Sequence, residues 1–314
     1  MSPVVSAIIT TCGRPQLLMH AIHSVLSQTL QDLEVIVVVD GPDTATMDVL
    51  ATIRDDRLRV YVQETRGGQS AAINTGVTLA RSPWIALLDD DDEWLPEKLA
   101  TQLACANASD AELVVGCRFV ARSEKGDTRW PLRIPKINER VGDYLFCRTR
   151  LVFGEGVLPT SILFASASLF RVHRMNETLK KHCDLDWLIR VDAAGVRCVV
   201  PATPEPLAVW HMQADRERMS NVHDWRFSYK WIADVRPLVT ERAYAGFLLT
   251  WASVSAREQA DYSAVWVLLR AAFRAGRPGL RELAIYCAVW TIPTGLRRRV
   301  SRRLTDISFS EEIQ

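Results

Sequence analysis

The chain has 314 residues, of which 48% are hydrophobic and 24% are charged, and 38 Lys+Arg against 37 Asp+Glu leave a formal net charge of +1. A chain of this length and composition can bury a full core without disulfides or structural metal, which excludes general disorder. The near-zero net charge argues against a nucleic-acid binder, because such proteins need a basic excess.

The first hundred residues alternate between short apolar runs and segments with helical spacing. Strands are expected at residues 4–10, 33–39, 58–62 and 84–88, and helices at residues 15–28, 44–53 and 67–80. This alternation is typical of an α/β fold, with a mostly parallel sheet flanked by helices on both faces. Such sheets bind ligands beyond the carboxyl ends of their strands, where this chain has Thr10, Thr11, Asp40 and a run of aspartates.

The rest of the chain changes character after about residue 220. Before that point we expect one or two strands in 111–130, loops with short elements in 131–165, a helix at 185–194, a strand at 197–200 and a strand-like run at 206–211. After it, helices are expected at 222–235, 238–254, 261–274, 280–291 and 294–304. The sequence therefore predicts a domain of residues 1–220, with halves at 1–105 and 106–220, and a helical region at 221–314.

The seven cysteines form no CxxC pair, so they predict neither a zinc site nor a disulfide framework. Reduced thiols in a cytosolic protein are the simplest interpretation. The N-terminus lacks the pattern of a signal peptide, and no run reaches the ~18 apolar residues that a membrane span needs.

Asp89, Asp90, Asp91 and Asp92 directly follow an apolar strand. Consecutive carboxylates repel one another unless a cation lies among them. Magnesium ions in proteins take one or two carboxylates plus substrate phosphates. We therefore favour a metal site over the alternative, a solvated acidic turn.

Two further features occur at strand ends. Gly67 and Gly68 precede Gln69 at a predicted helix start, where backbone N–H groups attract phosphate, although neither a P-loop nor a GxGxxG pattern is present. Asp40 ends the second strand, where a carboxylate can accept hydrogen bonds from a ribose hydroxyl or a base. A turn-initiating aspartate before Gly41 is at least an equal alternative.

In this order, the opening VSAIITT, the strand-end Asp40, the Asn74-Thr75-Gly76 helix and LLDDDDEW resemble the nucleotide-sugar half of family-2 glycosyltransferases with the GT-A fold. The resemblance is close over residues 3–105 and traceable to about 212. It implies a nucleotide-diphosphate sugar as donor and a DxD motif at residues 89–91.

The resemblance also implies roles for single residues. Asp91 would coordinate Mg²⁺ or Mn²⁺, and Asp89 would lie near the metal and the ribose. The base would be held by Asp40 together with the loop that carries Thr10, Thr11 and Arg14. The further residues expected to contact the donor are Gly68, Gln69, Asn74 and Asp90. Arg66 and Ile73 depart from the residues common in the family.

The segment from His182 to Arg190 resembles the part of the family that carries the general base, which maps to Asp184. Cys183 replaces the usual acidic neighbour, so the motif is incomplete. Asp186 is the fallback base, and Arg190 is expected to orient or pair with these carboxylates. Without the resemblance, Asp184 at a helix start would be interpreted as a helix cap.

His211 ends the strand-like run and is expected to be a third metal ligand or a diphosphate contact, with a structural histidine as the alternative. Trp210 before it either stacks on a sugar or belongs to the core. Residues 212–222, with Arg216, Arg218 and Ser220, are a candidate lid over the phosphates.

Residues 296–304 (LRRRVSRRL) carry five arginines and follow an apolar segment at 283–293. This combination suits peripheral contact with an anionic membrane, and a helical homodimer face or a solvated end are equal alternatives. The expected location is the cytoplasm, or the inner face of the membrane.

The sequence therefore predicts a metal-dependent, inverting glycosyltransferase. A UDP-sugar is the favoured donor, with dTDP and GDP open, and the acceptor is a glycan, a lipid-linked intermediate or a small molecule. The alternatives are a sugar-phosphate nucleotidyltransferase and a non-catalytic nucleotide-sugar-binding protein, the latter supported by Cys183.

Overall fold

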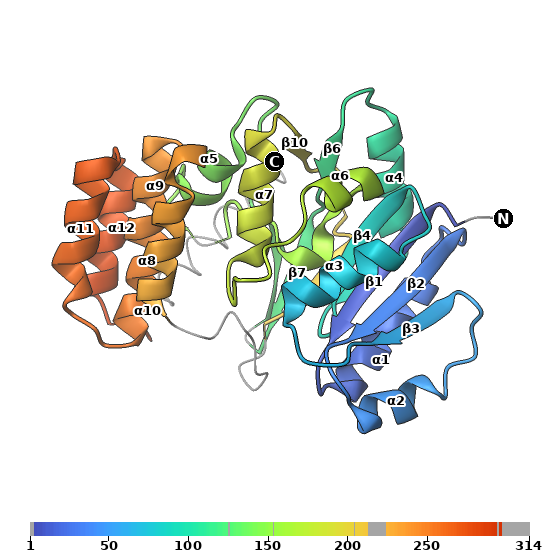
Figure 1. Cartoon of the computed structure of the whole chain (residues 1–314). Helices are drawn as coiled ribbons and strands as arrows, with labels where there is room; N and C mark the ends of the chain where they lie inside the picture. The colour runs from blue at the N-terminus through green and yellow to red at the C-terminus, as the bar shows by residue number, and fades with distance from the viewer. Residues whose placement is uncertain are drawn as a thin grey trace. The chain divides into compact units, whose positions relative to one another are not determined.

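The structure is a computed structural model, and it describes residues 3–124, 126–152, 154–203, 205–212, 224–293 and 295–296. The chain divides into two compact units (Figure 1). The first unit comprises Met1–Ile137 and Leu158–Arg216, and the second comprises Asn138–Val157 and Glu217–Gln314.

A seven-stranded sheet forms the centre of the first unit. In spatial order its strands are β10 (Arg197–Val199), β6 (Leu113–Val115), β9 (Phe164–Ser166), β4 (Trp84–Asp89), β1 (Val5–Thr11), β2 (Leu33–Val39) and β3 (Leu58–Val62). Strand β9 runs antiparallel to β4 and β6, and the other neighbours are parallel. Every residue of β1 and β2 is buried, as expected for a sheet covered on both faces. The predicted α/β architecture is confirmed.

Helices of the first unit match the predictions at 15–28, 44–53, 67–80 and 185–194, and two further helices, at residues 98–107 and 167–172, were not predicted. The helices of this unit are α1 (Pro15–Leu26), α2 (Thr44–Leu50), α3 (Gln69–Leu79), α4 (Lys98–Asn107), α6 (Ala167–Val172), α7 (Cys183–Ala193) and the short 3₁₀ turn η1 (Thr160–Ile162). Helix α1 buries Leu18, Ala21, Ile22 and Val25, which recur at three- and four-residue intervals along one face.

A second, four-stranded sheet lies in the same unit. Its order is β5 (Glu93–Trp94), β11 (Ala208–His211), β7 (Phe119–Ser123) and β8 (Gly126–Trp130). The expected strand at 206–211 belongs here, as do β7 and β8 from the stretch 111–130, whereas β6 from that stretch belongs to the large sheet. The two-residue strand β5 was not predicted. It is too short for a periodic signal, and its pairing with β11 joins segments more than one hundred residues apart. This pairing places the end of the aspartate run beside β11.

The second unit is helical in the residues that the structure describes. It contains α5 (Val141–Phe146), α8 (Trp225–Asp234), the turn η3 (Arg236–Leu238), α9 (Glu241–Phe247), the π-helical turn η4 (Leu248–Ala252), α10 (Ser253–Glu258), α11 (Ala264–Ala275) and α12 (Leu280–Thr291). The predicted helix at 238–254 is thus an α-helix, a π-helical turn and a second α-helix in succession. Except for residues 295 and 296, the predicted helix at 294–304 lies outside the described part of the chain.

Residues 138–157 differ from the expected division, which assigned them to the first domain. Their helix α5 packs against α9, with the Phe146 ring 5.0 Å from that of Phe247 and 5.9 Å from that of Trp251. A six-residue helix with buried Tyr144, Leu145 and Phe146 needs such a partner, because it cannot bury these side chains alone.

No helix in the described ranges combines the length and the apolar character that crossing a membrane requires.

Candidate active site

Three polar strand ends meet at the carboxyl edge of the large sheet. Strand β1 lies between β2 and β4 (Figure 1), and its Thr10 is in register with Val38 on one side and Asp89 on the other. The chain leaves this edge through Asp40 and through the aspartate run. The expected gathering of polar groups beyond the strand ends is therefore present in the structure.

The aspartate run splits into carboxylates with different surroundings. Asp89, Asp91 and Asp92 form a group in which one oxygen from each lies within 4.8 Å of the others. Burial, followed by the negative charges of Asp91, Asp90 and Asp184, raises the pKa of Asp89 to about 7. Hard divalent cations prefer oxygen ligands at such distances, and a bound cation would offset this repulsion. The donor set thus fits Mg²⁺ or Mn²⁺.

Asp90 is fully buried and is not a member of that group. Its Oδ2 accepts hydrogen bonds from Thr11 Oγ1 at 2.6 Å and from Arg14 Nε at 3.2 Å, and its Oδ1 lies 2.5 Å from a terminal nitrogen of Arg14. Burial raises the pKa of Asp90 to about 6, although Arg14 and Thr11 act in the opposite direction. Asp90 therefore fixes the loop after β1.

Asp92 joins three segments. Its Oδ2 accepts a hydrogen bond from Ser161 Oγ at 2.5 Å, and its Oδ1 accepts one from the backbone N–H of His211 at 3.1 Å. Ser161 Oγ in turn accepts the backbone N–H of Asp89 at 3.2 Å. With both oxygens already used, Asp92 is better suited to position the cluster than to contribute a primary ligand.

The His211 side chain faces Glu93, with its Nε2 2.7 Å from Glu93 Oε1. The metal-fitting group of carboxylates among the described residues does not include it. His211 thus borders the aspartate run through its backbone, and its expected role as a metal ligand has no support from the position of this nitrogen. Its neighbour Trp210 packs against Phe119 and Trp130, each with ring centroids 5.9 Å away, as in a core position.

Gln69, at the first turn of α3, connects the aspartate run with α7. Its Nε2 donates a hydrogen bond to Asp89 Oδ1 at 2.6 Å, and its Oε1 lies 3.5 Å from Cys183 Sγ, which donates to it. Burial, with Asp184 and Asp89 nearby, raises the pKa of Cys183 to about 12, so its thiol stays neutral and can donate. The cysteine that interrupts the family motif therefore has a defined partner.

Asp184 lies in the first turn of α7, after His182, whose φ of 65° places it in the left-handed region. Asp184 Oδ1 accepts the backbone N–H of Leu185 at 2.8 Å. Burial raises the pKa of Asp184 to about 6, although this hydrogen bond acts in the opposite direction. The charge of Asp184 contributes to the raised pKa of Asp89, and Gln69 bonds both to Asp89 and to Cys183 beside Asp184, so the two carboxylates lie near each other.

Asp186 and Arg190 form a separate pair along α7. Arg190 Nε is 2.8 Å from Asp186 Oδ2, and an Arg190 Nη donates to the carbonyl of Arg174 at 2.9 Å. Arg190 therefore pairs with one of the carboxylates, as expected, but that carboxylate is Asp186 rather than Asp184. An ionised partner of this kind makes Asp186 a poor base.

Asp40 holds the glycine turn that precedes α3. Its Oδ1 accepts the backbone N–H of Gly67 at 2.6 Å, and its Oδ2 accepts that of Gly68 at 3.0 Å. Gly68 has a φ of 83°, a conformation that glycine adopts readily. Asp40 thus brings the ends of β2 and the turn before α3 together at the expected edge.

Asn74 does not face the carboxylates. Its Nδ2 donates to the carbonyl of Met175 at 2.9 Å and to Glu177 Oε1 at 2.7 Å, and its Oδ1 accepts the backbone N–H of Met175 at 2.9 Å. The expected contact of Asn74 with the donor has no support from this geometry, in which its amide anchors residues 175–177 to α3.

Two site residues were missed by the sequence analysis. Ser161 lies on η1, inside a stretch expected to be loops, and Glu93 directly follows the four aspartates. A single serine in an irregular segment gives no local signal, since its role depends on a contact with Asp92, 69 residues away. Arg216, Arg218 and Ser220 of the expected lid lie outside the described residues.

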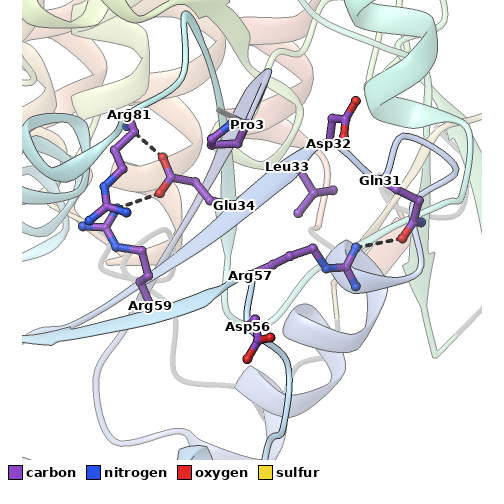
Figure 2. A pocket seen from close by; sticks show the side chains of 9 residues that line it. All are labelled: Pro3, Gln31, Asp32, Leu33, Glu34, Asp56, Arg57, Arg59 and Arg81. Carbon is purple, nitrogen blue, oxygen red and sulfur yellow. Dashed lines mark hydrogen bonds and ion pairs between the residues drawn. The ribbon is translucent and has the colours of Figure 1, made fainter. Parts of the chain in front are cut away.

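A cavity of about 450 Å³ lies at the opposite, amino-terminal edge of the sheet (Figure 2). Glu34 is central there, because its carboxylate accepts bonds from Ser6 Oγ at 2.7 Å, from the Arg81 backbone N–H at 2.7 Å and from Arg59 at 2.6 Å. These bonds tie together the starts of β1, β2, β3 and β4. The cavity is therefore separate from the carboxylate site and has a structural explanation.

Comparison with known proteins identifies relatives of the chain. The family model for Glycosyl transferase family 2 matches residues 6–173. The Glycosyltransferase GlyG of Streptococcus pneumoniae is 26% identical over 189 residues, which are 56% of this chain and 61% of that protein. The matched segments cover 61%, 32% and 57% of the full lengths of three curated relatives, so this chain spans only part of each of them.

Two solved structures share the fold. Residues 1–349 of TarS from S. aureus, in complex with UDP-GlcNAc, match with a TM-score of 0.61 at 15% identity, over 98% of this chain and 92% of that one. The mannosyltransferase PcManGT from Pyrobaculum calidifontis, in complex with GDP-Man and Mn²⁺, matches with a TM-score of 0.59 at 18% identity, over 99% and 87%.

Proposed function

Because the chain belongs to glycosyl transferase family 2, we propose that it transfers a sugar from a nucleotide-diphosphate donor to an acceptor hydroxyl in glycan biosynthesis, with inversion at the anomeric carbon. The observation that carries this proposal is the position of Asp184, whose charge acts on Asp89 of the aspartate cluster. A base and a diphosphate-binding edge in one site are what a single displacement requires.

Asp184 is the proposed general base. Its pKa of about 6 leaves the carboxylate mostly ionised at neutral pH, yet close enough to neutrality to accept a proton. Asp184 takes the proton of the acceptor hydroxyl while the acceptor oxygen bonds to the anomeric carbon. The bond from that carbon to the diphosphate oxygen breaks, and the nucleotide diphosphate leaves.

Asp89 and Asp91 are the proposed ligands of a divalent cation. When bound, Mg²⁺ or Mn²⁺ would supply a positive charge that offsets the charge developing on the leaving diphosphate. Asp92, held by Ser161 and by the backbone of His211, fixes the cluster. The Mn²⁺ in the structure of the Pyrobaculum mannosyltransferase supports this assignment.

The loop that Asp90 fixes is the proposed binding site of the nucleotide, with Asp40 and the turn at Gly68 beside it. A UDP-sugar is the proposed donor, supported by the UDP-GlcNAc in the structure of TarS. Arg14 of this loop lies 2.5 Å from Asp90 and 3.5 Å from Asp91, which ties the loop to the aspartate run.

The test is a thermal-shift screen of UDP-, dTDP- and GDP-sugars with and without Mn²⁺, on the native chain and on Asp91→Ala. We expect one donor to raise the melting temperature only when Mn²⁺ is present, and Asp91→Ala to abolish that rise. Equal stabilisation of both proteins would contradict the metal role.

Product formation from a labelled donor then separates an enzyme from a binding protein. Sugar transfer, or slow donor hydrolysis without acceptor, supports the glycosyltransferase. Tight donor binding with neither reaction, over a range of glycan and lipid-linked acceptors, would favour a nucleotide-sugar-binding protein instead.

A further inference from the structure

Helix α11 presents two different faces. Its buried side chains are Ala264, Leu268 and Ala272, which recur every four residues and pack into the second unit. Its outward side carries Trp266, which is 64% exposed, and Phe273, which is 59% exposed. Exposing such large aromatic side chains to water is unfavourable in free energy, which makes this surface a candidate for contact with a partner.

Arginines lie on the same outward side. Arg270 follows Trp266 by four residues and precedes Phe273 by three, which places all three on one side of the helix. Val267, which is 43% exposed, and Arg274 continue this side. We refer to Trp266, Val267, Arg270, Phe273 and Arg274 as the α11 face.

The charge around the α11 face has one sign. Residues 262–296 contain four arginines, at positions 270, 274, 277 and 281, and a single acid, Glu282. Glu282 is 0% exposed, because its Oε1 accepts the backbone N–H of Arg148 at 2.6 Å and lies 3.6 Å from Arg242. Every exposed charge in this stretch is therefore positive.

Acids on neighbouring segments pair with arginines outside the α11 face. Glu241 lies 2.5 Å from Arg277, and Asp261 lies 2.8 Å from Arg226. Glu241 therefore offsets the charge of Arg277, and the positive charge of the α11 face itself is carried by Arg270 and Arg274.

We propose that the α11 face docks on an anionic lipid bilayer, with the helix lying in the plane of the interface. Tryptophan and phenylalanine are suited to the level of the headgroups, and arginines bind lipid phosphates. The two aromatic residues are seven positions apart, or about 10 Å along the axis, so both reach the same plane. This inference is independent of the proposed function.

A second copy of the chain fits this surface less well. Two α11 faces packed together would bring four arginines of one sign to a single interface, and like charges at an interface oppose association. An anionic bilayer instead offers acidic groups to the arginines and an apolar layer to Trp266 and Phe273.

The test is co-sedimentation of the full chain with vesicles of phosphatidylglycerol and phosphatidylcholine, and with vesicles of phosphatidylcholine alone, at low salt. We expect binding to the anionic vesicles only, and release in ~1 M salt, where charges are screened within about 3 Å. Arg270→Gln/Arg274→Gln should lower the partition coefficient about 25-fold, at about five-fold per arginine. Trp266→Gln should lower it about ten-fold.

Matched controls lie on the first unit. Arg54→Gln removes one exposed arginine that donates to the carbonyl of Ala51, and Tyr61→Gln removes an aromatic ring that is 43% exposed. Both should bind vesicles like the native chain, and circular dichroism should show all variants folded. The proposal would be overturned if the chain bound anionic and neutral vesicles equally, or if Arg270→Gln/Arg274→Gln and Trp266→Gln both bound like the native chain.

A separate measurement addresses self-association through the same surface. One outcome is a native dimer in light scattering that Phe273→Glu converts to a monomer, with neither protein binding to vesicles. The α11 face would then be an interface between copies of the chain, and the lipid proposal would fail. A native chain whose state does not respond to Phe273→Glu, together with vesicle binding, supports it.

Discussion

Asp184 and Asp186 stand two residues apart on α7, but their carboxylates have different partners. The carboxylate of Asp186 is 2.8 Å from Arg190 Nε. The carboxylate of Asp184 instead accepts the backbone N–H of Leu185, and its charge contributes to the raised pKa of Asp89. A raised pKa favours a carboxylate as the general base, and an ion pair disfavours it. These surroundings therefore favour Asp184 over Asp186 as the proposed base.

Asp184→Asn should lower kcat by about 10²–10⁴-fold and leave donor binding intact, because the amide cannot take the acceptor proton. In the native chain, kcat/KM should rise with pH through about 6, since the base acts in its deprotonated form and burial raises its pKa to about that value. A pH series of initial rates measures this.

The matched control is Asp186→Asn, which removes the ion pair with Arg190 and leaves Asp184 untouched. It should lower stability and keep the pH profile. Normal turnover by Asp184→Asn, or a lost pH dependence in Asp186→Asn alone, would reverse the assignment.

Gln69 supports the proposed metal site through Asp89. Gln69→Leu removes the 2.6 Å hydrogen bond to Asp89 Oδ1, and loss of such a supporting contact typically weakens metal affinity about 10–100-fold. Calorimetric titration with Mn²⁺ measures the change. Gln63→Leu is the control, because its amide contacts Thr75 instead of a carboxylate. Equal Mn²⁺ affinity in Gln69→Leu and the native chain would show that the contact is incidental.

At the scale of elements, α3 links the sheet to the site. Its Gly76 lies against β1 so closely that an added Cβ would be 2.5 Å from Ile8 Cγ2. Its Asn74 holds residues 175–177, which lead toward α7. The position of the helix thus decides where both Gln69 and the segment before Asp184 lie.

Gly76→Ala should destabilise the chain by about 1–3 kcal/mol, because the methyl group forces α3 away from β1. The exposed Thr78 on the same helix provides the control, and Thr78→Ala should stay within about 0.5 kcal/mol of the native value. Urea unfolding measures both. A Gly76→Ala variant as stable as Thr78→Ala would mean that α3 has room to shift.

At the scale of the molecule, the second unit is built from two separate stretches of chain. Residues 138–157 belong with the C-terminal helices, and Glu282 of α12 reinforces this through the backbone N–H of Arg148. Cutting the chain at the expected boundary would therefore separate elements of one core.

A truncated chain ending at residue 220 should aggregate or elute as large oligomers in size-exclusion chromatography. It retains α5 but lacks α9 and η4, which cover Phe146. A second truncation in which Phe146→Ser removes the main exposed ring should elute closer to a monomer. A monodisperse, folded 1–220 fragment would show that α5 does not depend on these helices.

The local pattern of the sequence predicted the strands of the parallel sheet, most of the helices and the edge at which the polar groups gather. These features follow from the period of apolar residues and from the residues next in the chain, so a single sequence contains them. The resemblance carried by VSAIITT and LLDDDDEW added the family, which the match over residues 6–173 shows.

The tertiary structure decided which partner each polar side chain contacts. Asp90 meets Arg14, Asp92 meets Ser161, His211 meets Glu93 and Gln69 meets Cys183. These partners are 69 to 118 residues apart in the chain, so no local pattern predicts them. The sequence by itself determined which groups reach the carboxyl edge, because that depends on strand periodicity. Only the packing of distant segments decided which protein groups each of these carboxylates meets.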